Sequence, residues 1–369
     1  MTHKNLNRIA PFLVALMLCA CGGGGGNSTA GGGNGGGGGN GGGDTNPVAD
    51  TVFAAKELPA PAAGSFSTGV SINAGGLAVG LASDGTAIKA VKWSVNDEAP
   101  TPTRLQPMAG VGYSAAYGVN DTGTTVGEVQ GAGAVTAAFW PAGATVASPL
   151  STAGLPGGKS SAFDINTGGE IVGEATDAEG NSVAVYWPST SAAPLILGNL
   201  TQEAGAFSSA YFISDTGLIV GESLNASGLP QAVLWQAANA TFTAGEQPLA
   251  LEAIPLQLSS VALGVDVDGR IAGESKLADG TTRGILWSAD GGLSGNLGEN
   301  SSAQAISNTG RIVGFKTLEN GAAGAHVWNA EDLADNQSLG ASGSQAFGVN
   351  DSAQVVGSTG STAFAAIPQ

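Results

Sequence analysis

The segment DINTGGEIVG, residues 164–173, recurs with the same internal spacing at six other places in this chain of 369 residues. Every copy has Ile or Val followed by Asn, Asp or Ser, and a Gly three positions later that only Ala353 replaces. A second Gly always follows four residues after that position. The seven copies occupy residues 71–80, 118–127, 164–173, 212–221, 264–273, 305–314 and 348–357.

The residue types in this module predict a β-hairpin. Asn and Asp tolerate left-handed backbone angles and bond to their own main chain, and the turn Gly supplies a positive φ. The flanking Ile and Val favour the pleated surface of a strand. The second Gly falls inside a predicted strand, where glycine usually marks a bulge or a close backbone approach.

A tryptophan follows each of the first six modules, 13 or 14 residues after the second Gly, and these six are all the tryptophans in the chain. Three positions before the Trp stands Ala, or Gly284 in one repeat. A large ring paired with a small residue indicates interlocking packing between layered sheets, so we expect core residues rather than an aromatic binding surface. The tryptophans are Trp93, Trp140, Trp187, Trp235, Trp287 and Trp328.

A further short apolar stretch lies between each Trp and the next module, for example at residues 103–108, 193–200 and 247–254. Each repeat therefore holds four candidate strands, and successive second glycines are separated by 41 to 52 residues. A four-stranded unit with about this period is typical of β-propeller blades. We predict an all-β fold over residues 48–369, a seven-bladed β-propeller of four-stranded blades.

The last repeat, from about Ser344 to Gln369, has room for only three strands. The segment TVFAAKELPAP, residues 51–61, resembles the fourth-strand stretches of the other repeats. We expect this N-terminal strand to complete the seventh blade beside the C-terminal strand at about 362–367. Such closure removes an exposed sheet edge.

Residues 1–20 have the features of a bacterial lipoprotein signal peptide. The apolar run at residues 9–18 is too short to span a bilayer but suits a signal-peptide core. The sequence LCAC at 18–21 resembles the lipobox, which implies lipidation (palmitate) of Cys21, and Gly22 implies sorting to the outer membrane. The alternative is an ordinary secretory signal in which Cys21 is a spare thiol. The predicted location is the cell envelope, lipid-anchored at the outer membrane and either periplasmic or surface-exposed.

Residues 21–47 contain the lipidated Cys and a glycine-rich linker. There are 16 glycines among the 22 residues 22–43, which leaves almost no side chains to bury. We predict a flexible tether with a root-mean-square reach of roughly 25 Å.

The composition excludes several classes of function. The formal net charge is -17, which disfavours nucleic acid as a partner. Both cysteines, Cys19 and Cys21, lie near the start, so the body of the chain has no Cys-based zinc site or disulfide framework. His326 is the only histidine beyond the first few residues. We expect no cofactor and no metal.

The repeat resembles the extracellular HAF-type repeat, named for its His-Ala-Phe motif. The nearest copy is SAFDINTGGEIVGE at 161–174 with VAVYW at 183–187, and the likeness covers about residues 67–369. The His and Phe of the second half of the motif are mostly missing, and in the last repeat Ala366 replaces the Trp. The resemblance implies an extracytoplasmic repeat protein and no particular substrate.

Three groups of residues are candidates for a functional site. Glu128, Glu174, Glu222 and Glu274 each follow the second Gly and could form a ligand-facing acidic arc in a propeller, or else lie on a solvated strand edge or turn. Asp266 and Asp268 precede Gly269 as in a calcium loop, but the further ligands of that loop are missing. His326 stands where other repeats have Val or Ile, which favours a packed or surface role over catalysis.

The pattern as a whole favours a non-enzymatic binding or scaffold module for an unknown protein or glycan, with Cys21 as membrane anchor. We expect a monomer. An alternative is a propeller-type carbohydrate-active enzyme, a hydrolase or lyase with paired carboxylates from different blades. A third is a purely structural surface protein without a small ligand.

Overall fold

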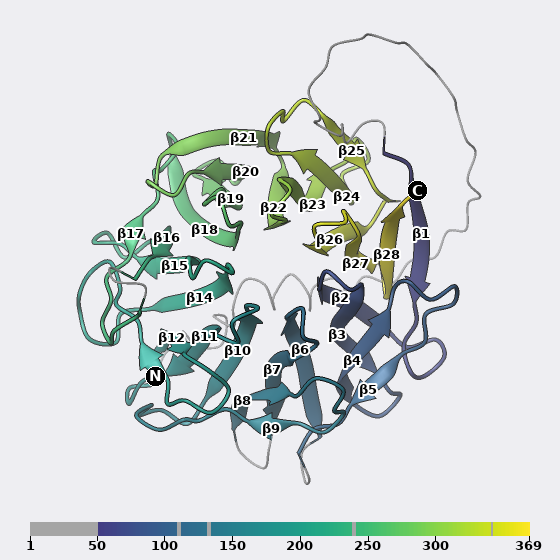
Figure 1. Ribbon diagram of the computed structural model, residues 1–369. Coiled ribbons are helices and arrows are strands. Elements are labelled where there is room, and N and C mark those ends of the chain that lie inside the picture. The colour runs from purple at the N-terminus through teal and green to yellow at the C-terminus, as the bar shows by residue number, and fades with distance from the viewer. Residues whose placement is uncertain (1–50, 109–111, 131–133, 238–240, 341) are drawn as a thin grey trace, which may run out of the picture.

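The computed structural model describes residues 51–108, 112–130, 134–237, 241–340 and 342–369. These residues form 28 strands, which make seven four-stranded antiparallel sheets arranged in a ring around one axis (Figure 1). The predicted seven-bladed β-propeller is therefore confirmed. Cys21, the predicted signal peptide and the glycine-rich linker lie outside the described residues. Within the described part, no helix is long and apolar enough to cross a membrane.

Six blades follow the chain in order, with the first strand of each nearest the axis. The strands of blades 1 to 3 are β2 (Ser67–Ile72), β3 (Leu77–Ser83), β4 (Ile88–Ser94), β5 (Thr103–Leu105); β6 (Tyr113–Val119), β7 (Thr125–Gln130), β8 (Val135–Trp140), β9 (Ser148–Pro149); β10 (Ser160–Ile165), β11 (Ile171–Thr176), β12 (Ser182–Trp187) and β13 (Leu195–Ile196). Those of blades 4 to 6 are β14 (Ser208–Ile213), β15 (Ile219–Leu224), β16 (Pro230–Trp235), β17 (Leu249–Ala250); β18 (Gln257–Val265), β19 (Ile271–Leu277), β20 (Thr282–Trp287), β21 (Leu293–Glu299); β22 (Ser301–Ile306), β23 (Arg311–Thr317), β24 (Ala323–Asn329) and β25 (Asn336–Ser338).

Blade 7 joins the two ends of the described chain. It consists of β26 (Ser344–Val349), β27 (Val355–Thr359), β28 (Thr362–Pro368) and the N-terminal β1 (Phe53–Leu58). Strand β1 runs antiparallel to β28, in register from Phe53↔Pro368 to Leu58↔Ala363. The predicted closure by an N-terminal strand is confirmed, with strand bounds two or three residues inside the segment 51–61.

Each module forms the predicted hairpin between the first and second strands of its blade. The turn glycines have positive φ, for example 81° at Gly169. Ala353, the one replacement, also takes a left-handed φ of 57°. The backbone shape of the turn is therefore kept even where the side chain costs about 1 kcal/mol of strain.

The second glycine of the module lies opposite a β-bulge in every blade. In blade 3 the register shifts between Ala162 and Asp164 on β10, and Gly173 on β11 pairs with Ala162. A Cβ on Gly173 would lie 2.0 Å from the carbonyl oxygen of Ser161, too close for any side chain. Both expectations for this glycine, a bulge and a close backbone approach, are therefore confirmed.

The six tryptophans are core residues, each at most 1% exposed. They stand at or next to the end of the third strand of blades 1 to 6. Each of five indole N–H groups also donates to a backbone carbonyl that follows the outer strand of the preceding blade. These pairs, at 2.8–2.9 Å, are Trp93–Pro59, Trp140–Gln106, Trp187–Ser151, Trp235–Gly198 and Trp287–Glu252.

A buried serine joins each blade to the one before it, a contact that the sequence interpretation missed. In blade 4, Ser208 Oγ accepts the backbone N–H of Ala184 on β12 at 3.0 Å, and the other junctions repeat this bond. The ring closes where Ser67 accepts from Ala363. The remaining pairs are Ser114–Ala90, Ser160–Ala137, Ser260–Ala232, Ser301–Gly284 and Ser344–Ala325. The small residue three positions before each Trp therefore also leaves room for the serine of the next blade.

Candidate functional site

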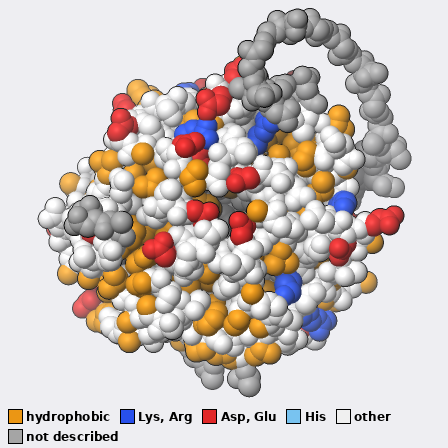
Figure 2. All heavy atoms as spheres, in the orientation of Figure 1, with side chains coloured by type: hydrophobic (Ala, Val, Ile, Leu, Met, Phe, Trp, Pro, Cys, Tyr) orange, Lys and Arg blue, Asp and Glu red, His pale blue; other side chains and the backbone are white. Residues whose placement is uncertain are grey.

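A cavity of about 180 Å³ opens on the propeller axis, at the face where the module turns lie. Its wall comes from the first strand of every blade, and most of the module turns form its rim. Figure 2 shows acidic side chains around a hollow near the centre of the disc. Because all seven blades contribute, the cavity exists only in the closed ring.

A chain of asparagine side chains holds the rim of this cavity together. Asn350 Nδ2 donates to the carbonyl oxygen of Asn73 at 2.8 Å, and Asn73 Nδ2 donates to that of Asn120 at 3.0 Å. Asn120 and Asn166 continue the chain to the carbonyl oxygens of Asn166 and Ser214. The polar third residue of the module thus bonds the next blade as well as its own turn.

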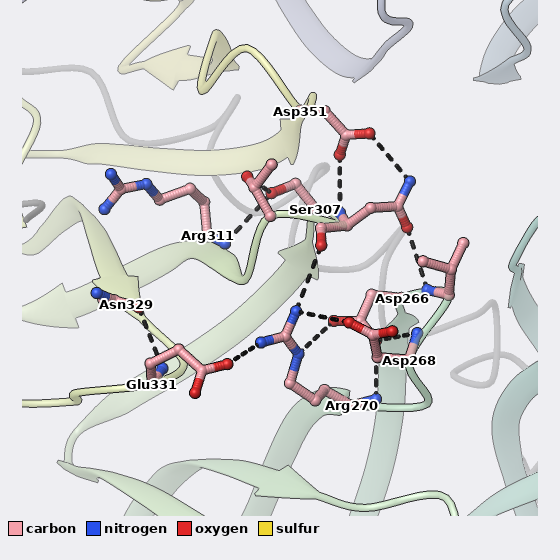
Figure 3. Close-up of polar contacts among 11 residues, drawn as sticks. Asp266, Asp268, Arg270, Ser307, Arg311, Asn329, Glu331 and Asp351 are labelled. Atoms are coloured by element: carbon pink, nitrogen blue, oxygen red, sulfur yellow. Dashed lines mark hydrogen bonds and ion pairs between the residues drawn. The ribbon is translucent and has the colours of Figure 1, made fainter. Parts of the chain in front are cut away.

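Three exposed aspartates, at the following position of the turn, stand on the rim. Asp121 Oδ1 accepts the N–H of Ala74, and Asp215 Oδ1 accepts that of Thr167, at 2.9 and 2.8 Å. Asp351 accepts both the backbone and the side-chain N–H of Asn308 (Figure 3). Each carboxylate fixes the turn of the preceding blade and remains at the surface.

Three aromatic rings from neighbouring blades form one side of the cavity wall. The rings of Tyr117 and Phe163 meet edge to face with centroids 5.8 Å apart, and those of Phe163 and Tyr211 lie 5.7 Å apart. The tyrosine hydroxyls are occupied by buried acids, since Tyr117 donates to Glu128 at 2.9 Å and Tyr211 to Glu222 at 2.7 Å.

The four glutamates of the predicted arc occupy the middle of the second strands, not a solvated edge or turn. Glu128 and Glu222 are 6% and 5% exposed, and Glu174 and Glu274 are half-buried. They reach across blade junctions, because Ser161 Oγ donates to Glu128 at 2.5 Å and Ser209 Oγ to Glu174 at 3.2 Å. None of the four is among the residues that line the cavity.

Burial shifts the pKa values of two of these glutamates. It raises the pKa of Glu174 to about 7, against a lowering by the Ser209 hydrogen bond, and the charges of Glu128 and Glu222 raise it further. Burial also raises the pKa of Glu274. The same cause raises the pKa of Asp164, which lies in the cavity wall, to about 7.

Replacing Glu174 by Gln should weaken the pH dependence of stability. The carboxyl titrates near 4.5 when unfolded and near 7 when folded, so the folded chain binds the proton more tightly between these values. Its contribution to stability is therefore present below about pH 4.5 and is lost as the pH rises to about 7. We expect E174Q to stabilise the protein by roughly 1–2 kcal/mol at pH 8, less than the full shift because the side chain is only half-buried.

Thermal unfolding at pH 4.5 and pH 8 measures this effect. The charge-matched control is Glu179→Gln in the exposed loop between β11 and β12. If E174Q and E179Q respond to pH in the same way, the buried carboxyl does not carry the dependence.

Asp266 and Asp268 contact an arginine of the same turn (Figure 3). Arg270 Nε lies 2.5 Å from Asp266 Oδ2, and Arg270 Nη2 lies 3.5 Å from Asp268 Oδ2. The guanidinium also bonds Glu331 and the carbonyl oxygen of Asn308, so it bridges blades 5 and 6. This paired arrangement differs from a calcium loop. Among the described residues, no group of three or more His, Asp or Glu side chains is placed to hold a metal ion.

His326 is packed inside blade 6. It is 9% exposed, its ring lies 4.6 Å from that of Trp328, and its Nε2 hydrogen-bonds Asn336 Oδ1 at 2.8 Å. Burial lowers the pKa of this histidine. It is not among the residues that line the cavity, whereas the rim aspartates are.

Comparison with solved structures agrees with the propeller fold. No protein-family model and no curated protein matches the chain. YCF48 from Cyanidioschyzon merolae is similar with a TM-score of 0.51 at 10% identity, over 85% of this chain and 98% of that chain. YCF48 bound to D1 peptide gives 0.50 at 12% identity, over 88% and 96%. TolB from Acinetobacter baumannii gives 0.48 at 11%, over 85% of this chain but only 65% of TolB. At these identities the likeness concerns the fold alone, and the class defined here is a seven-bladed β-propeller with an axial cavity.

Proposed function

We propose that this chain is a cell-envelope lipoprotein whose propeller acts as a non-enzymatic binding or scaffold module for a protein or glycan. The observation that carries the proposal is the axial cavity, which all seven blades build and whose rim is held by bonds between blades. A concave site that combines apolar walls with convergent polar groups is typical of ligand binding. The similar propeller YCF48, bound to D1 peptide, supports this choice.

The lipoprotein part of the proposal rests on the sequence. The lipobox-like residues 18–21 and Gly22 favour a lipid-anchored protein at the outer membrane, and the HAF-like repeats favour an extracytoplasmic one. A glycine-rich tether would then allow the propeller to search for its partner near the membrane.

Site-specific photo-crosslinking in cells tests the binding role on the full-length chain. A photoreactive residue in place of Ala74 stands at the cavity rim, and one in place of Ala178 stands in the β11–β12 loop on the opposite face. We expect a discrete adduct from the Ala74 site and none from the Ala178 site. Adducts only from Ala178, or from neither site, would contradict the cavity as the binding surface.

Replacing Cys21 by Ala should release the protein from the membrane or leave its signal peptide uncleaved, because the acyl chains on this residue supply the attachment. Cys19→Ala is the matched control, since signal cleavage before Cys21 removes Cys19. Carbonate washing of membranes followed by immunoblotting measures both variants. Full membrane retention of C21A protein that the immunoblot shows at the size of the cleaved chain would exclude lipidation at Cys21 as the attachment.

The alternative remains a propeller-type hydrolase or lyase. Its supporting observation is Asp164, whose pKa is raised to about 7 mainly by burial, with a smaller contribution from the charge of Asp215 on the next blade. Asp164 Oδ2 accepts the N–H of Ile213 at 3.1 Å, which ties the carboxylate to the wall. Glycosidic turnover by the wild type that Asp164→Asn abolishes without loss of folding would favour the enzyme.

A further inference from the structure

We infer that the axial cavity binds an alkylammonium group, either a free organic cation or the side chain of a lysine on a protein partner. The inference rests on the proposed binding function and names the chemistry of the ligand. Three properties of the cavity support it: the aromatic wall, the hydrogen-bonding groups of the rim, and the charge of the lining.

The wall offers rings and aliphatic side chains to an apolar stem. Tyr117, Phe163 and Tyr211 form a continuous three-ring surface, and Phe347 of blade 7 also lines the cavity. Both tyrosine hydroxyls bond to buried glutamates. The part of each tyrosine that remains for the cavity is therefore the carbon atoms of its ring. Aromatic faces attract ammonium and quaternary ammonium groups within about 6 Å of the ring centroid.

The polar groups of the rim accept hydrogen bonds and have few donors left. The side-chain amides of Asn73, Asn120, Asn166 and Asn350 all donate to carbonyl oxygens of neighbouring blades. The rim aspartates can only accept when ionised. An anionic ligand would find no counterpart here, and a sugar would find few donors for its hydroxyl oxygens. A primary ammonium group brings only donors, and a quaternary ammonium group requires no donor from the rim.

The charge of the lining has one sign. It includes four carboxyl groups, and none of the described residues that line the cavity is Lys, Arg or His. The acidic residues are Asp121, Asp164, Asp215 and Asp351. A concave site that is lined by carboxylates and has apolar walls concentrates cations from solution. The chain as a whole, at a formal net charge of -17, reinforces this attraction.

Calorimetric titration of the detergent-solubilised full-length protein tests the inference with four probes. Tetramethylammonium and choline are the free cations, and a short peptide with one central lysine represents a protein source. The fourth probe, 3,3-dimethylbutan-1-ol, has the shape of choline without its charge. We expect the cations or the lysine peptide to bind and the neutral alcohol to bind at least about tenfold more weakly.

Variants of the cavity assign the site. Phe163→Leu removes a ring while keeping apolar volume and should weaken binding about fivefold. Asp215→Asn with Asp351→Asn should weaken it roughly threefold per charge and reduce its dependence on salt, because Asn retains the oxygen that holds each turn. Glu179→Gln, which changes the same charge on the opposite face, should have no effect. Unchanged circular dichroism and melting temperature establish that each variant is folded.

The outcomes distinguish a small organic cation from a lysine of a protein partner. They also distinguish failure of the alkylammonium assignment from failure of the proposed binding function. Binding of tetramethylammonium and choline supports a small organic cation, and binding of the peptide alone supports a lysine of a protein partner. Equal binding of the neutral alcohol, binding unaffected by the cavity variants, or binding of none of the probes would overturn the alkylammonium assignment. In those cases a crosslink from the Ala74 site in cells would still support the proposed binding function. The two proposals are therefore tested separately.

Discussion

Trp187→Ala is expected to destabilise the protein by about 3–5 kcal/mol, because it replaces a fully buried ring by a cavity. Trp187 is 0% exposed and packs with Val126, Ile171 and Val185 in the core between blades 2 and 3. Its indole N–H bonds the carbonyl oxygen of Ser151 at 2.9 Å, and that carbonyl would lose its partner. Chemical denaturation with a two-state fit measures the change.

The control for this variant is Trp187→Phe, which keeps most of the apolar volume but loses the N–H. We expect it to cost clearly less than the alanine variant. An unchanged midpoint in W187A, together with a lost binding activity, would mean that the ring serves a ligand instead of the core.

Deletion of residues 48–62 should open the ring at blade 7. The deletion removes β1 and leaves the outer edge of β28 without its partner over the register from Ala363 to Pro368. It also removes Leu58, which is 0% exposed in the core cluster of blades 7 and 1. We expect a melting temperature lower by about 10 °C, and association of molecules through the free edge.

A deletion of equal length in the glycine-rich linker, residues 26–40, is the matched control because it leaves β1 in place. Calorimetry and size-exclusion chromatography with light scattering measure both variants. A monomeric 48–62 deletion with an unchanged melting temperature would mean that β1 contributes nothing to closure.

The repeats made the fold predictable from the sequence. The period, the module turns and the repeated Trp together indicate the blades, and the missing seventh outer strand indicates the closure by residues 51–61. The stretches 103–108, 193–200 and 247–254 each contain an outer strand, but the sequence did not indicate the strand lengths, since β13 and β17 have only two residues each. Their lengths depend on how far the outer segment follows a twisted blade.

The serine junctions were missed although a signal was present. A serine stands six residues before the polar turn residue in all seven repeats, as in Ser160 before Asn166. Serine is common on surfaces and in loops, so its regular spacing suggested nothing by itself. Its partner, the N–H of Ala137, belongs to the preceding repeat, and only the packing of blades brings the two together.

The site was predictable only in part for a similar reason. The regularly spaced glutamates were identified from the sequence. The hydroxyl groups that hydrogen-bond them come from other strands, as with Tyr117 for Glu128 and Ser209 for Glu174. The rim aspartates are turn residues from different blades, and they line one cavity only because the ring closes. Distances across an axis follow from blade number and tilt, which the spacing along one chain does not contain.

The strand that closes the ring is also the first strand of the described chain. Everything that precedes Thr51 is attached through β1, so any pulling force on the N-terminal segment enters blade 7 first. A force along β1 must shear all of its register pairs with β28 together, whereas a sideways force would peel them apart one at a time, beginning at Phe53↔Pro368. If the N-terminal segment is anchored in a membrane as proposed, tension between that membrane and a bound partner would act on the axial cavity, since opening blade 7 separates the walls that form it.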